Sequence, residues 1–154
     1  MIVAPVAGTL TRPELVFSEL PATDCRGVLR ELADRVAATG LVRDAGAVYR
    51  ALLEREQLGS TGLGHGVAIP HCKLRGLEQG ILAVGIARPP VDFGAADGEP
   101  VSPFFLVLSP DQNPAEHLQT LARISRWVRA DQHVETLLAL PDRAAVYDFL
   151  KESV

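Results

Sequence analysis

The sequence has few cysteines and no recognisable signal peptide, unlike secreted proteins with disulfides or proteins with cysteine-bound metals. Its two cysteines, Cys25 and Cys72, lie far apart and form neither a metal-type pair nor a disulfide framework. Such sparse use of cysteine is typical of a protein in the reducing cytosol. Residues 1–10 are apolar, but they lack the basic segment and the long apolar core of a signal peptide. The sequence therefore gives no sign of export.

Long apolar runs and an excess of positive charge are also missing. The longest run of apolar residues and glycine, 81–87, is far shorter than the roughly 18 residues that a membrane span needs. The net charge is −4, and charges of both signs are interspersed along the chain. A nucleic-acid-binding surface would instead show as a basic patch. We therefore expect a soluble, cytoplasmic protein with neither membrane insertion nor a nucleic-acid partner.

What is present fits one globular domain of 154 residues. Residues 1–13 carry two prolines and no hydrophobic period, which predicts a loose N-terminal arm before a single domain at 14–154. Helical and strand patterns alternate after that arm, which indicates an α/β fold with helices covering a small sheet. The expected strands are 15–20, 67–69, 81–87 and 101–108, and the expected helices are 24–39, 44–57, 113–130, 131–139 and 142–151.

Capping residues and apolar spacing define these helices. Thr23 or Asp24 can begin the first helix, and Gly40 can end it. Asn113 and Glu116 have the spacing of a capping box around Pro114 at the start of the long helix. Its expected buried face contains Leu118, Leu121, Ala122, Ser125 and Val128.

The stretch 59–74 concentrates the residues of chemical interest. Its four glycines predict a loop whose backbone can approach a ligand closely. A short buried strand at 67–69 follows, and Pro70 ends it because proline cannot donate to a sheet ladder. His71 is therefore expected where a strand gives way to a loop.

Three chemistries can be considered for this stretch. Nucleotide-binding loops run in the order strand, glycine loop, helix, whereas the order here is helix, loop, strand. A metal site would need His65, His71, Cys72 and His117 to converge, and their spacing matches no usual zinc pattern. The third chemistry is nucleophilic attack by a neutral His71 imidazole. The alternative is that His71 merely follows a proline in a turn.

Residues 53–73 have the sequence Leu-Glu-Arg-Glu-Gln-Leu-Gly-Ser-Thr-Gly-Leu-Gly-His-Gly-Val-Ala-Ile-Pro-His-Cys-Lys. This segment strongly resembles the phosphohistidine signature of the phosphotransferase-system enzyme IIA proteins of the fructose/mannitol class. The Gly-Ser-Thr-Gly-Leu-Gly segment is most similar to the nitrogen-regulatory branch of that class. The resemblance covers roughly residues 14–152. It implies a mixed central sheet flanked by helices on both faces, and a phosphocarrier that needs no cofactor and no metal.

The resemblance also implies roles for individual residues. His71 would be phosphorylated by the phosphocarrier protein HPr or its nitrogen-branch counterpart, His117 would flank the phosphoryl group, and Arg55 would steady its charge. On the residues alone, Arg55 could be a helix-end cation and His117 a surface histidine. The cradle for the phosphoryl group would comprise Ser60, Thr61, Gly62, Gly64 and Gly66.

Two residues depart from the family pattern. Cys72 stands where glycine is usual, and it is either an oxidisable thiol or a buried spectator. His65 replaces an asparagine, and it either hydrogen-bonds phosphoryl oxygens or serves only in the loop. We expect the donor to dock on an exposed apolar surface that includes Leu63 and Leu74.

The output of the phosphocarrier is less determined than its chemistry. The regulatory role is favoured, with target proteins that read the phosphorylation state. The alternatives are a sugar-specific EIIA that passes phosphate to the cysteine of a separate EIIB domain, and a metal-binding or inactive descendant. A homodimer also remains open.

Overall fold

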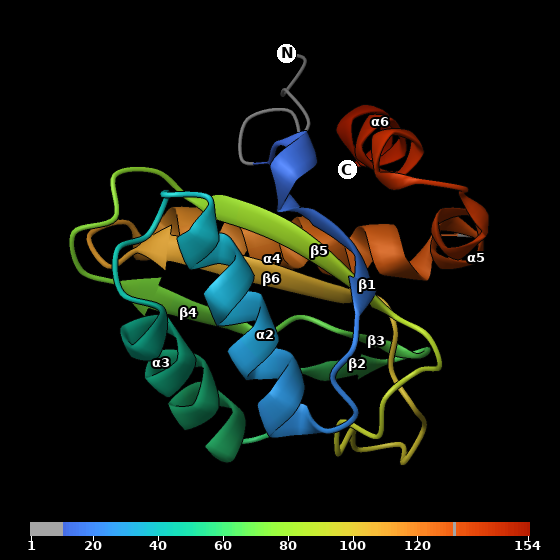
Figure 1. Cartoon of the computed structure of the whole chain (residues 1–154), viewed down its shortest axis with the longest axis horizontal. Coiled ribbons are helices and arrows are strands. Elements are labelled where there is room, and N and C mark those ends of the chain that lie inside the picture. The colour runs from blue at the N-terminus through green and yellow to red at the C-terminus, as the bar shows by residue number, and fades with distance from the viewer. Residues whose placement is uncertain (1–10, 131) are drawn as a thin grey trace.

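A computed structural model describes residues 11–130 and 132–154 (Figure 1). Residues 1–10 of the expected N-terminal arm lie outside the described residues. In chain order the elements are η1 (Pro13–Leu15), β1 (Val16–Leu20), α2 (Cys25–Ala38), α3 (Ala45–Gln57), β2 (Gly62–Gly64), β3 (Val67–Ala68), β4 (His71–Leu74), β5 (Ile81–Ala87), β6 (Phe104–Pro110), α4 (Pro114–Arg129), α5 (His133–Ala139) and α6 (Arg143–Ser153). Among these helices, none has both the length and the hydropathy to cross a bilayer.

The six strands form one mixed sheet in the order β1-β5-β6-β3-β2, with β4 also paired to β6. β5 and β6 run antiparallel at its centre, and β1 lies parallel to β5. β3 and β4 pair in parallel with successive parts of β6, and β2 closes a hairpin with β3. The expected mixed sheet is confirmed.

Helices cover both faces of this sheet, as expected (Figure 1). Side chains on a strand alternate between faces, so β6 serves two cores. Phe104, Leu106 and Leu108 pack toward α2 and α3. Phe105 and Val107 pack in the second core, with residues of α4, α5 and α6. The position of a residue along β4 or β6 therefore decides which set of helices its side chain meets.

Aspartates begin three of the helices as N-caps. The side chains of Asp24, Asp44 and Asp142 each accept a hydrogen bond from the backbone N–H three residues on, at 2.7–3.1 Å. The capping box expected at Asn113 is not formed. The side-chain amide of Asn113 instead donates to the Glu116 carboxylate at 2.5 Å. The Asn113 side chain makes no hydrogen bond to the backbone of the helix start.

Two strand predictions need correction. The strand expected at 101–108 begins at Phe104, and Val101 forms only an isolated bridge with Val91. His71 does not lie at the end of a strand but is the first residue of β4. Pro70 interrupts the path from β3 to β4 because it has no N–H, yet its carbonyl accepts from the Val107 amide at 3.0 Å. The edge strand therefore resumes along β6 directly after the proline.

Candidate active site at the start of strand β4

His71 is held by the backbone of its own segment. Its Nδ1 lies 2.7 Å from the carbonyl oxygen of Ile69. A carbonyl oxygen only accepts hydrogen bonds, so Nδ1 carries the proton of the neutral ring. The ring's lone pair is thereby placed on Nε2. The half-buried His71 presents a nucleophilic nitrogen in a fixed tautomer.

The surroundings of His71 favour its neutral form. Its pKa is lowered from 6.5, chiefly because burial disfavours the charged ring, and the positive charge of Arg55 adds to the effect. The hydrogen bond to Ile69 and the charge of Glu56 oppose this shift without reversing it. At neutral pH the imidazole is therefore available for attack.

The register of β4 against β6 assembles the site on the α4 face of the sheet. His71 pairs with Val107, and Lys73 pairs with Ser109. Because Val107 belongs to the core under α4, the residues that share its side of the pleat also face that helix. The sheet thus directs His71, Lys73 and Ser109 toward the first turn of α4.

His117 lies in that first turn and meets His71. The two ring centroids are 5.4 Å apart with an interplanar angle of 50°. Nδ1 of His117 lies 2.6 Å from Oγ of Ser109. Burial, His71 and Lys73 lower the pKa of His117 to about 4, in that order of importance. His117 is therefore a neutral imidazole next to His71.

The buried face of α4 differs from the one expected. Leu118 is 67% exposed and His117 only 5%. Ala122 is also exposed, and Leu121 and Ser125 are only half-buried, whereas Val128 is buried as expected. The residues that line the inner side of the helix are His117, Thr120, Ile124, Trp127 and Val128. Two of these are polar because the helix begins over the site rather than over the apolar core.

Arg55 approaches from the last turn of α3. Its Nη1 donates to the carbonyl oxygen of Gly59 at 2.8 Å, and its charge contributes to the lowered pKa of His71. A guanidinium has five N–H donors. The bond to Gly59 therefore leaves donors for an anion, and it fixes a positive charge that acts on His71.

Glu56 was not among the predicted site residues. Its carboxylate accepts from both the amide and the hydroxyl of Thr61, at 2.8 and 2.5 Å. The Thr61 carbonyl in turn accepts from the Ile69 amide at 3.0 Å. Glu56 thereby ties the end of α3 to the backbone that holds His71. The only signal in the sequence was its place directly after Arg55.

The glycine-rich stretch is a β-hairpin, not the single open loop that was expected. His65 and Gly66 have φ values of 57° and 76°, which suit the two central positions of a tight hairpin turn. Gly66 accepts from the Ser102 amide at 2.9 Å. The structure thus places Gly64 and Gly66 in the hairpin and its turn, and the exposed His65 lies at the tip.

The other predicted cradle residues, Ser60, Thr61 and Gly62, make hydrogen bonds in the segment that leads to Ile69. Ser60 accepts from the Gly62 amide at 3.1 Å through its hydroxyl, and Thr61 is joined to Ile69 as described above. The structure thus brings Ser60, Thr61 and Gly62 to the base of the hairpin. Gly64 and Gly66 lie further along the hairpin, and the five-residue cradle stays a prediction.

Cys72 alternates with His71 along β4 and so faces the opposite core, with α2 and α3. Burial raises the pKa of its thiol to about 12. Among the described residues there is also no group of three or more histidine, cysteine or acidic side chains that could hold a metal ion. Of the four residues considered for a metal site, the structure brings together only His71 and His117.

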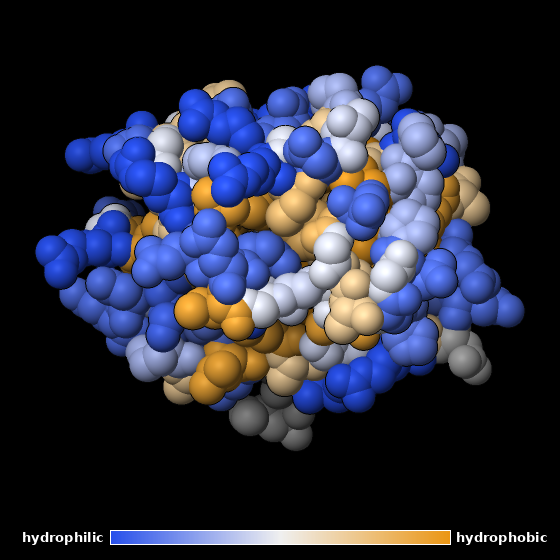
Figure 2. All heavy atoms as spheres, turned by 90° about the horizontal axis from the view of Figure 1, so that it is seen from below, coloured by the Kyte–Doolittle hydropathy of each residue, from blue (hydrophilic) through white to orange (hydrophobic). Residues whose placement is uncertain are grey.

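Three large apolar side chains are exposed on the elements that build the site. Leu58 follows α3 and is 81% exposed, Leu63 in β2 is 38% exposed, and Leu118 in α4 is 67% exposed. The molecule seen from below the view of Figure 1 shows hydrophobic residues at the surface between hydrophilic ones (Figure 2). Leu74, which we expected in this surface, instead packs partly buried against the core under α2 and α3.

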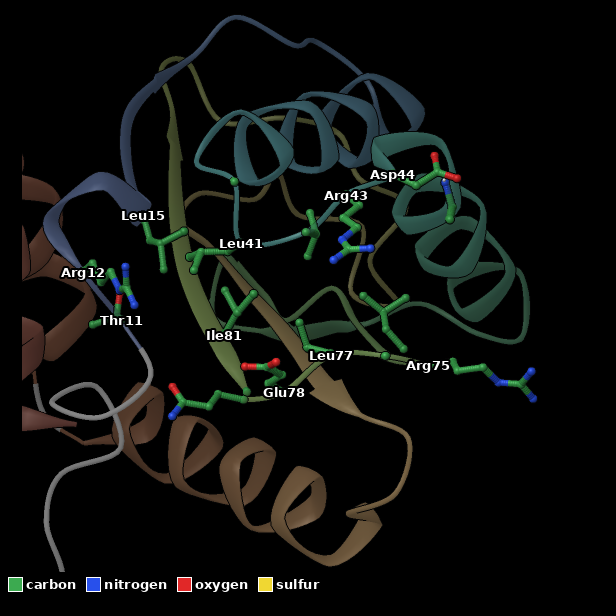
Figure 3. Close-up of a pocket in the computed structure, with 17 residues that line it drawn as sticks. Thr11, Arg12, Leu15, Leu41, Arg43, Asp44, Arg75, Leu77, Glu78 and Ile81 are labelled. Atoms are coloured by element: carbon green, nitrogen blue, oxygen red, sulfur yellow. Dashed lines mark hydrogen bonds between the residues drawn. The ribbon is translucent and has the colours of Figure 1, made fainter.

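A cavity of about 790 Å³ lies away from the histidines, between η1, the start of α3 and the turn before β5 (Figure 3). Arg43 and Glu78 extend into it, whereas Arg75 points away. None of the residues assigned to the phosphoryl site lines it. The cavity is therefore separate from the histidine pair.

Comparisons with known proteins identify the family of the chain. The model of the family described as "Phosphoenolpyruvate-dependent sugar phosphotransferase system, EIIA 2" matches residues 9–153. A nitrogen regulatory protein of Bradyrhizobium diazoefficiens is 40% identical over 142 residues, covering 92% of each chain. A fructose-specific EIIA component of Haloferax volcanii is 34% identical over 146 residues, covering 95% of each chain.

Solved structures give the same result. The crystal structure of the nitrogen regulatory protein IIA-Ntr from Neisseria meningitidis has a TM-score of 0.86 at 30% identity, covering 93% of this chain and 97% of that one. The Escherichia coli mannitol IIA structure, at 19% identity, shares the fold with a TM-score of 0.75 and coverages of 90% and 97%. The chain belongs to the EIIA type-2 family of the phosphoenolpyruvate-dependent sugar phosphotransferase system.

Proposed function

We propose that the protein is a cytoplasmic phosphocarrier that accepts a phosphoryl group on Nε2 of His71. The observation that carries this proposal is the 2.7 Å hydrogen bond from His71 Nδ1 to the Ile69 carbonyl. It leaves Nε2 as the nitrogen with the lone pair, and the lowered pKa keeps that lone pair free at neutral pH.

The transfer step needs no metal, nucleotide or added base. The Nε2 lone pair of His71 forms a bond to the phosphorus of a phosphohistidine on the donor protein. The phosphorus–nitrogen bond of the donor breaks, and its electron pair returns to the donor imidazole. No proton has to leave Nε2, because the proton of His71 is already on Nδ1. The Ile69 carbonyl then faces the positive charge that develops on the phosphorylated ring.

Neighbouring groups can stabilise the phosphoryl oxygens. Phosphoryl transfer depends mainly on positioning and on electrostatic stabilisation of the oxygens. Arg55 supplies a guanidinium, and Lys73 supplies an exposed ammonium group on the same side of β4 as His71. His117 supplies a neutral ring 5.4 Å away, centroid to centroid.

The donor in this proposal is HPr or its nitrogen-branch counterpart. A partner must bring its own phosphohistidine to within bonding distance of His71, so it must dock on the surface around the site. The exposed apolar side chains of Leu58 after α3, Leu63 in β2 and Leu118 in α4 lie on or next to elements that build the site and can contact such a partner. Alone, the protein would turn over no free small molecule.

The output we favour is regulatory, with target proteins that distinguish the phosphorylated from the unphosphorylated form. The 40% identity to a protein named nitrogen regulatory protein supports this. The second candidate is transfer to the cysteine of a separate EIIB domain, supported by the 34% identity to a fructose-specific EIIA component. A IIB/IIC permease encoded beside this chain, and rapid transfer to its IIB domain, would favour the second.

The test is incubation with an HPr-type protein carrying labelled phosphate. We expect one labelled histidine in the wild-type protein, with phosphorus on Nε2 by ³¹P–¹⁵N NMR, and no label in His71→Ala. His65→Asn is the matched control, because that histidine lies in the same stretch but at the exposed hairpin tip. Persistent labelling of His71→Ala would disprove the assignment.

A further inference from the structure

Ser109 lies at the end of β6 and belongs to no motif in the sequence. It is 5% exposed, and its Oγ lies 2.6 Å from Nδ1 of His117. It also pairs in register with Lys73, on the same side of the sheet as His71. A polar side chain is thus buried against the second histidine of the site.

The direction of this hydrogen bond follows from how the hydroxyl can be satisfied. A serine hydroxyl has one proton to donate, and an imidazole nitrogen can donate or accept. Within residues 11–130 and 132–154, His117 Nδ1 is the one hydrogen-bond partner of Ser109 Oγ. If Nδ1 were the donor, the hydroxyl proton would be buried without an acceptor, which is unfavourable. The hydroxyl therefore donates to Nδ1.

We propose that Ser109 is a positioning residue that keeps the proton of His117 on Nε2, so that His117 donates a hydrogen bond to a phosphoryl oxygen on His71. The inference rests on the proposed function, because it needs a phosphoryl group at His71. It adds a residue outside the histidine signature, acting through His117 rather than by contact with the phosphoryl group.

The charges around His117 explain why its tautomer matters. His71 and Lys73 both disfavour a positive charge on it, in addition to burial. The neighbouring acid on α4, Glu116, is hydrogen-bonded to Asn113. A neutral imidazole helps an anionic phosphoryl group only through its N–H, whereas a lone pair directed at the oxygens would repel them. Ser109 would favour the neutral tautomer of His117 that carries its proton on Nε2.

The first measurement reads the tautomer without any phosphorylation. In ¹⁵N NMR spectra of the side chains, wild-type His117 should show a protonated Nε2 and an accepting Nδ1. Ser109→Ala should shift this ring toward a mixture of tautomers and leave His71 as Nδ1–H, while Ser109→Thr should keep the wild-type pattern. A wild-type His117 with its proton on Nδ1, or an unchanged tautomer in Ser109→Ala, would overturn the inference.

The second measurement is the initial rate of transfer from a labelled HPr-type donor. Ser109→Ala should be slower than wild type by roughly 3- to 10-fold, as expected for one lost hydrogen bond, and Ser109→Thr should restore the rate. In a His117→Ala background the serine change should have no further effect. An additive slowing in the double variant would mean that Ser109 acts elsewhere. Failure of the wild-type protein to be labelled would instead count against the proposed function and leave the tautomer result standing.

Discussion

The two histidines of the site are neighbours in space but are held in different ways. His71 is fixed by a backbone carbonyl two residues before it in its own segment, whereas His117 is fixed by the side chain of Ser109 on a strand eight residues away. A backbone acceptor survives any substitution that keeps the fold, and a side-chain partner can be removed by one mutation. In the proposed function, the histidine that reacts is therefore held by a backbone group, and the histidine that assists it depends on a side chain that one mutation can remove.

Alanine substitutions of the two histidines should separate these roles most clearly. His71→Ala should abolish phosphorylation, because the attacking nitrogen is gone. His117→Ala should slow it by roughly 100-fold, the usual scale for removing one donor that stabilises developing charge. Single-turnover transfer from a labelled donor measures both. Equal loss in the two variants would mean that His117 also reacts or that its removal disorders β4, and circular dichroism with the His71 NMR signals would distinguish these cases.

Substitution of Arg55 should have the next largest effect on the transfer rate, and it should affect the two histidines differently. Arg55→Gln should slow transfer by roughly tenfold, since it removes one charged hydrogen-bond donor. It should also raise the pKa of His71, because the positive charge of Arg55 helps to lower it. The pKa of His117 should change little, since burial, His71 and Lys73 account for its shift. NMR titration of both rings measures this, and an equal shift in the two histidines would contradict it.

Local signals in the sequence predicted many of the helix starts and strand ends. The aspartates that begin α2 and α3 were recognisable from their position before apolar periodicity, and Pro70 correctly ended the short strand β3. The start of β4 at His71 was not predictable in the same way. It depends on parallel pairing with β6, more than thirty residues later, and local propensity carries no information on that register.

The orientation of α4 shows a second limit. Apolar periodicity assigns leucines to the buried side, and it therefore placed Leu118 inside. The structure exposes Leu118 and buries His117 and Thr120, because the first turns of the helix cover a polar site at the end of the sheet. Sequence rules of this kind fail where function replaces core packing. Here that failure coincides with the proposed docking surface.

The difference between the histidines also predicts how stability depends on pH. His117 has a folded-state pKa of about 4, below its usual 6.5, so between these values the unfolded chain binds a proton that the folded chain does not. Stability from this source is fully present above about pH 6.5 and is lost as the pH falls toward 4. His117→Asn should flatten the change in unfolding free energy over this range.

Urea unfolding at several pH values tests that expectation, with His65→Asn as the exposed control. His71 contributes in the same direction, because its pKa is also lowered, so some pH dependence should persist in His117→Asn. An acid dependence identical to that of the wild-type protein would contradict a buried, neutral His117.

Cys72 is the neighbour of His71 for which we expect the smallest effect on transfer. It follows His71 directly, yet its side chain packs in the opposite core, and burial raises its pKa to about 12. A protonated, buried thiol reacts slowly with oxidants and alkylating agents. Cys72→Ala should therefore leave the transfer rate unchanged and lower the free energy of unfolding by about 1 kcal/mol through lost packing. The opposite outcome would be that peroxide blocks phosphorylation of the wild-type protein but not of Cys72→Ala. That result would show that the thiol affects the site although it faces the other side of the sheet, and it would contradict the separation of the two sheet faces at β4.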